Sequence, residues 1–73
     1  MTLRDLGQKL KEMYENAPRG EQVTMIHLFG VKFADSIKEV GVKEVIDEAG
    51  ISSTYRTELN KAINLAKYVR PIN

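Results

Sequence analysis

Two segments with helical periodicity meet at a glycine in VKEVIDEAGISSTYRTEL, residues 42–59. In the first segment the apolar side chains share one face of a helix: Val42, Val45, Ile46 and Ala49. Gly50 follows at the position where a residue of left-handed conformation commonly ends a helix. Ser52 or Ser53 is expected to cap a second helix, because serine is a preferred N-cap residue. The stretch therefore predicts two helices joined by a short turn.

The second helix is expected to run from Ser53 to about Val69 and to stop before Pro71. Its predicted buried stripe consists of Tyr55, Leu59, Ala62, Ile63, Ala66 and Val69. The opposite face is poor in acids, because Glu58 lies toward the other flank. Asn, Arg, Ser and Thr side chains hydrogen-bond base edges and phosphates in DNA. The candidate DNA-binding residues are Ser53, Arg56, Thr57, Asn60, Lys61, Asn64 and Lys67. A mixed polar face is also typical of any solvated helix.

The N-terminal residues predict another amphipathic helix. Thr2 followed by Asp5 matches a variant of the capping box. Apolar side chains then recur at helical spacing: Leu3, Leu6, Leu10, Met13 and Tyr14. NAPRGE, residues 16–21, should end this helix, since Pro18 disfavours a helical residue before it.

The segment between residues 21 and 41 fits two patterns. Helical spacing favours two short helices that are broken or kinked near Gly30, the second of them closed by Gly41. Alternating apolar residues leave an extended conformation open for residues 22–29. We favour the helical interpretation. The whole chain is then a single all-α domain, residues 1–73, with four or five short helices around one core.

Composition excludes several classes of protein. Eleven lysines and arginines stand against ten acids, and a net charge of +1 argues against strong sequence-independent DNA binding. The apolar runs are far shorter than the roughly 20 residues that span a bilayer. The N-terminus carries Asp5 and does not resemble a secretory signal, so we expect a cytoplasmic protein without membrane contact.

Catalysis, metal binding and cofactor binding find no support in the sequence. The chain has no cysteine and one histidine, and it lacks a glycine-rich phosphate loop. We therefore expect neither an enzyme nor a cofactor. His27 is interpreted as a residue at the edge of the core with one satisfied nitrogen. Lys32, Lys38 and Lys43 could contact phosphates that flank a DNA site, but we favour the interpretation that each belongs to a solvated charged face.

Leu65 and Tyr68 lie off the predicted buried stripe and should be partly exposed. Their position gives the hypothesis of a homodimer, which would double the DNA contacts of a weakly charged domain. Isolated exposed apolar residues are also common on monomers.

Residues 42–59 resemble a helix-turn-helix unit, with Gly50 in the turn and with Ile51 and Leu59 at its apolar positions. Two residues depart from the usual pattern: Ile46 is bulkier than the common alanine, and Tyr55 has an altered phase. A larger part of the chain is similar to a small bacterial HTH-like domain family of poorly defined function. It includes IHLFGVKFADSI, residues 26–37, and GISSTYRTELNKAINLAKYV, residues 50–69. This resemblance implies double-stranded DNA as a partner, with a regulatory role or an association with restriction or prophage functions.

The C-terminal part, residues 50–69, is also similar to SAM domains, in which a glycine turn leads into a long final helix. That resemblance implies a helical protein–protein interaction module. The chain lacks the aromatic-rich early segment of SAM domains and contains no tryptophan. The SAM-like interpretation is therefore the alternative.

Overall fold

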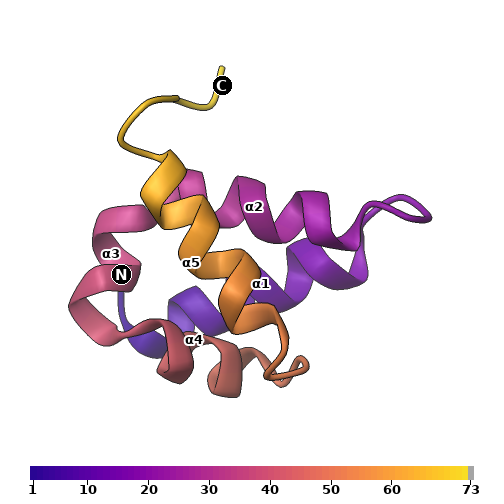
Figure 1. The fold of residues 1–73 in the computed structure, drawn as a ribbon. Helices are drawn as coiled ribbons and strands as arrows, with labels where there is room; N and C mark the ends of the chain where they lie inside the picture. The colour runs from indigo at the N-terminus through magenta and orange to yellow at the C-terminus, as the bar shows by residue number, and fades with distance from the viewer. Residues whose placement is uncertain (73) are drawn as a thin grey trace.

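The computed structural model describes residues 1–72 and places five helices in them (Figure 1). They are α1 (Leu3–Glu15), α2 (Gln22–Lys32), α3 (Ala34–Val40), α4 (Val42–Ala49) and α5 (Tyr55–Leu65). No strand occurs within residues 1–72, so the predicted all-α class is confirmed. Residues 22–29, for which an extended conformation was the alternative, lie entirely within α2. None of these helices is both long and apolar enough to cross a membrane.

The helix α1 begins at the predicted cap. The Thr2 hydroxyl accepts the backbone N–H of Asp5 at 3.1 Å, and the Asp5 carboxylate accepts the N–H of Thr2 at 3.3 Å. This capping box satisfies two backbone donors that the helix leaves without an internal partner. Leu6 and Leu10 of the predicted stripe are fully buried, and the helix ends at Glu15 with Asn16 as its C-cap residue. The interpretation of this segment is confirmed.

The two predicted short helices are confirmed, but the break between them lies at Phe33 and not at Gly30. The helix α2 continues through Gly30 to Lys32, and Phe33 separates it from α3 with φ −118° and ψ 25°. Gly30 serves close packing instead, because a Cβ there would lie 2.5 Å from Ala62 Cβ and 3.0 Å from Leu59 Cδ1. A residue without a side chain lets α5 approach α2 this closely. The contact between the two helices explains the glycine.

Two glycines end the short helices α3 and α4, as predicted. Gly41 has φ 102°, and Gly50 has φ 73° and ψ 21°, which is the left-handed region. Glycine adopts these angles without the steric cost that a Cβ brings. The Gly50 N–H donates to the carbonyl of Ile46 at 3.1 Å and closes the last turn of α4. The chain can therefore turn sharply before α5.

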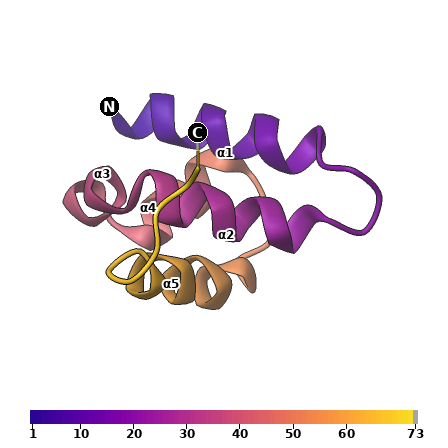
Figure 2. The same ribbon diagram turned by 90° about the horizontal axis from the view of Figure 1, so that it is seen from above.

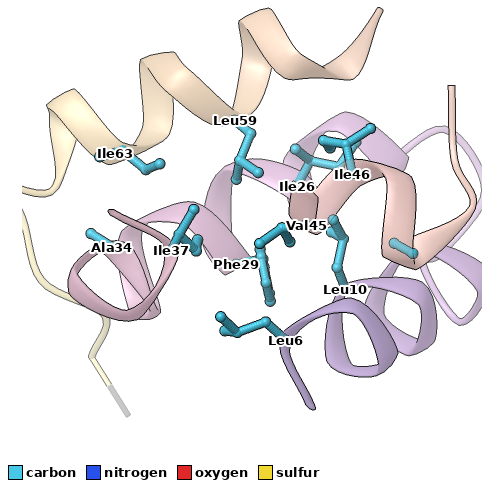
Figure 3. Packing of buried hydrophobic residues seen from close by; sticks show 11 residues of the cluster. Leu6, Leu10, Ile26, Phe29, Ala34, Ile37, Val45, Ile46, Leu59 and Ile63 are labelled. Atoms are coloured by element: carbon cyan, nitrogen blue, oxygen red, sulfur yellow. The ribbon is translucent and has the colours of Figure 1, made fainter. Parts of the chain in front are cut away.

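The core lies between α2 and the other four helices. Figure 2 shows α2 between α1 and α5, and α4 contacts both α1 and α5. Every helix contributes buried apolar side chains (Figure 3): Leu6 and Leu10 from α1, Ile26 and Phe29 from α2, Ala34 and Ile37 from α3, Val45, Ile46 and Ala49 from α4, and Leu59 and Ile63 from α5. Because each helix anchors the others through this cluster, the position of α5 depends on the whole chain.

Candidate nucleic-acid interface

The helix α5 rests on α2 along its buried face. His27 of α2 lies opposite Glu58, and Gly30 lies opposite Ala62, so the chain passes the contact in the same sense on both helices, which cross obliquely (Figure 1). Leu59, Ala62 and Ile63 form the part of α5 that is turned into the protein. The opposite face of α5 consequently points into solvent, as the sequence predicts.

All seven candidate DNA-binding side chains are exposed: Ser53, Arg56, Thr57, Asn60, Lys61, Asn64 and Lys67. Five of them lie on α5 itself, between its second residue and its next-to-last residue. They bring together amides, a hydroxyl and two cations, the groups that donate hydrogen bonds to phosphates and base edges. Ser53 lies in the preceding turn, and Lys67 lies beyond the helix.

The last helix is shorter than the sequence predicts. It ends at Leu65 rather than near Val69, and Val69 is 43% exposed rather than buried. After Leu65 the backbone tightens into a turn, in which the Tyr68 N–H donates to the carbonyl three residues earlier at 2.9 Å. Ala66 still packs partly against the core, but Val69 does not, so the predicted buried stripe stops one turn early.

The predicted serine cap of α5 is also wrong. Thr54 is the N-cap residue, and no side-chain hydrogen bond caps the helix. The Ser52 hydroxyl instead accepts the backbone N–H of Thr54 at 3.3 Å and contacts the Thr54 hydroxyl at 2.9 Å. The Arg56 Nε–H donates to the carbonyl of Ser53 at 3.3 Å, which holds the base of the guanidinium against the turn. The polar residues after Gly50 thus order the turn before the exposed face begins.

Glu58 is the single carboxylate of α5, and it lies on the α2 side of the helix. His27 Nε2 donates to Glu58 Oε1 at 2.8 Å, and Lys61 Nζ donates to Glu58 Oε2 at 3.4 Å. The hydrogen bond from His27 is the main reason that the pKa of Glu58 is lowered. An ionised carboxylate only accepts, so His27 Nε2 carries the proton. His27 is half-buried with one bonded nitrogen, as its interpretation as a core-edge residue requires.

The helix α4 carries acids where α5 carries cations and amides. Its exposed acidic side chains are Glu44, Asp47 and Glu48. Lys43 Nζ donates to Asp47 Oδ2 at 2.9 Å, and this hydrogen bond raises the pKa of Lys43, while the nearby charge of Arg56 lowers it. The carbon chain of Glu48 packs against Gly7 of α1. Lys43, which is paired with Asp47, therefore lies near Arg56 where α4 meets α5.

The family model of an HTH-like domain matches residues 2–72. The chain belongs to the HTH-like domain family. No curated protein and no solved structure matches the chain significantly. The match covers nearly the whole sequence, so it confirms the resemblance to this family and extends it to α1. The resemblance to SAM domains has no counterpart among these comparisons.

The two departures of this HTH-like domain from the usual pattern have structural explanations. Ile46 is fully buried in the core. Tyr55 is half-buried and packs edge-on against Tyr14 of α1, with the ring centroids 5.5 Å apart and the hydroxyl oxygens 3.3 Å apart. The hydrogen bond between the hydroxyls is the main cause of the raised pKa of Tyr14. The altered phase of Tyr55 thus reflects a contact with α1, outside the helix-turn-helix unit.

The C-terminal end of the HTH-like domain exposes apolar side chains. Leu65 is 47% exposed and Tyr68 is 82% exposed, as the sequence predicts. Val69 and Ile72 are exposed at the same end of the chain. Residues 31–36 and Ala66 line a hollow of about 330 Å³ at the junction of α2 and α3. No group of three or more potential metal-binding side chains occurs in residues 1–72.

Sequence reasoning missed two parts of the site. The contact between His27 and Glu58 joins residues 31 positions apart, and neither residue belongs to a recognisable motif. Ser52 was considered only as a helix cap, although it orders the turn through Thr54. A serine and a threonine two positions apart are typical of such turns, so the second signal was available in the sequence.

Proposed function

We propose that this HTH-like domain binds double-stranded DNA through the exposed face of α5. The observation that carries this proposal is the placement of Glu58. The only carboxylate of α5 is bonded to His27 and Lys61, so the exposed face offers amides, a hydroxyl and cations. A DNA backbone would meet no unbalanced acid on this helix. Membership of the HTH-like family supports the same partner.

The candidate residues would contact different parts of the DNA. Arg56, Thr57, Asn60 and Asn64 face bases or phosphates, and Lys61 and Lys67 contact the phosphate backbone. Ser53, in the turn, lies next to the guanidinium of Arg56 and would meet a phosphate at the edge of the groove. Phosphate contacts place a protein on DNA, whereas base contacts give it sequence preference. The domain acts as a binding module in the cytoplasm, with a regulatory role or one linked to restriction or prophage functions, and without catalysis or a cofactor.

The exposed apolar end supports a second element of the proposal. Two copies of the chain associate through Leu65 and Tyr68, both of which are exposed in the monomer. A domain of net charge +1 gains from such pairing, because two α5 helices double the number of phosphate contacts. Sedimentation at several protein concentrations tests this pairing. A monomer at every concentration, with and without DNA, contradicts it.

An NMR titration with mixed-sequence duplex DNA tests the proposed function. At low ionic strength we expect chemical shifts to change mainly in residues 53–67, and the shifts should reverse as salt is added. Arg56→Ala and Asn60→Ala should each weaken binding by about 1–3 kcal/mol and leave the thermal stability unchanged. If the wild-type protein shows no shift at any DNA concentration, the DNA proposal fails. A protein partner, as in the SAM-like alternative, then becomes the better explanation of the exposed surface.

A further inference from the structure

The contact between α2 and α5 contains one hydrogen bond between side chains within residues 1–72. It joins His27 Nε2 to Glu58 Oε1 at 2.8 Å. The side chain of His27 is 40% exposed and that of Glu58 is 28% exposed. The pair is shielded enough to persist, yet open enough for the imidazole to exchange protons with solvent. His27 belongs to α2 and lies outside the helix-turn-helix unit.

The carboxylate of Glu58 is shared between two donors. His27 binds one oxygen, and Lys61, a proposed phosphate contact, binds the other at 3.4 Å. When the imidazole is neutral, Lys61 is the cation that balances the charge of Glu58. When the imidazole is protonated, it balances that charge itself, and the ammonium of Lys61 can turn to another anion. The side chain of Lys61 is 66% exposed, so nothing blocks this movement.

We propose that His27 is a positioning residue for DNA binding by α5: it holds Glu58 against α2 and, on protonation, releases Lys61 to a phosphate. This inference rests on the proposed function. Binding of DNA is then coupled to the uptake of one proton by His27. Affinity for duplex DNA rises as the pH falls through the range in which imidazoles titrate.

Other charged groups near the pair do not produce the same effect. From α5, Glu58 and Lys61 face His27. From α1, the titratable group that reaches α5 is Tyr14, and tyrosine is neutral below about pH 8. Lys32 and Asp35 lie further along, at the junction of α2 and α3. Side chains of these types do not change charge between about pH 6 and pH 8.

The test compares the full-length protein with His27→Gln in binding to a mixed-sequence duplex at about pH 6 and about pH 8. Glutamine can donate an amide N–H to Glu58, but it cannot gain a proton. We expect the affinity of the wild-type protein to be roughly threefold to tenfold higher at the lower pH. At the lower pH, the affinity of the wild-type protein should also depend more steeply on salt than at the higher pH. The slope of log affinity against log salt concentration should be steeper by about 0.9, because one more phosphate is neutralised. His27→Gln should show equal affinity and equal salt dependence at both pH values.

Glu58→Gln provides a second variant, because it releases Lys61 at any pH. We expect it to bind at about pH 8 at least as tightly as the wild-type protein does at about pH 6. Thermal unfolding of both variants shows whether they fold. In the free protein, the single histidine gives one set of imidazole NMR signals, and these should move in Glu58→Gln. Unchanged signals contradict the pairing without any use of DNA.

Two outcomes separate the inference from the proposed function. If His27→Gln gains affinity at low pH as much as the wild-type protein does, the role of His27 is wrong and DNA binding stands. If the wild-type protein binds no duplex at either pH at low salt, the proposed function and this inference are both overturned.

Discussion

The two helices of the helix-turn-helix unit carry opposite charges on their exposed surfaces. On α4, three acids are exposed, and its one lysine is paired with Asp47. On α5, the one acid is bonded to His27 and Lys61, and the exposed face is uncharged or cationic. A net charge of +1 conceals this division, because it sums charges of both signs over the whole chain. The distribution of charge between α4 and α5 is therefore more informative than the net charge.

The largest expected effect is on stability, when the buried side chain that holds α5 in the core is removed. The exposed surface of α5 exists only while this helix is packed in place. Leu59→Ala deletes a fully buried side chain and is expected to lower the free energy of unfolding by about 2–5 kcal/mol. Leu65→Ala, which truncates an exposed leucine of the same helix, should change it by less than about 0.5 kcal/mol. Urea denaturation measures both values. Equal effects of the two variants would show that α5 does not pack through Leu59.

An acid on the exposed face of α5 would reduce the difference in charge between the surfaces of α4 and α5. Asn60→Asp changes little in shape and adds one negative charge at the centre of this face. We expect it to weaken binding to duplex DNA by about 1–3 kcal/mol. Gln8→Glu makes the same chemical change at an exposed position of α1 and should alter affinity much less. Titrations of both variants at one low salt concentration decide the matter, and equal losses would mean that only total charge matters.

Removal of the N-cap of α1 should cause a smaller loss of stability, away from the exposed surfaces of α4 and α5. Thr2→Ala removes the hydroxyl that accepts the N–H of Asp5, and it should cost about 1 kcal/mol of stability. Affinity for DNA should remain that of the wild-type protein under conditions in which both are folded. Thermal unfolding and a DNA titration measure the two quantities. A loss of affinity in this variant would show that binding follows stability rather than the surface of α5.

The smallest expected effect concerns the stability of the fold at low pH. Because the pKa of Glu58 is lowered in the folded protein, ionised Glu58 stabilises the fold at pH values above the pKa it has when unfolded. This stabilisation is lost as the pH falls through the lowered pKa, below about pH 4.5. Glu58→Gln should therefore lose less stability than the wild-type protein between about pH 5 and pH 3. Denaturation curves at several pH values measure the difference, and parallel losses would contradict the pairing with His27.

Local features of the fold could be predicted from the sequence because nearby residues determine them. The capping box of Thr2 and the glycine ends of α3 and α4 each depend on a few adjacent residues. The exposed face of α5 followed from helical spacing alone.

The remaining features depend on residues that are distant in sequence. Gly30 looked like a helix breaker, and only the approach of Ala62 reveals its packing role. The helix α5 ends at Leu65, and no local sequence pattern indicates this end. The bond from His27 to Glu58 spans 31 positions and needs the arrangement of α2 beside α5.

The contact between Tyr14 and Tyr55 gives the domain an intrinsic optical reporter. The chain has no tryptophan and three tyrosines, so its near-ultraviolet emission comes from tyrosine alone. Two of the three rings meet across α1 and α5, and the third, Tyr68, is 82% exposed. In a Tyr68→Phe variant, tyrosine fluorescence would therefore report on this one contact. The docking of the final helix onto the first could be followed in time without attaching a dye.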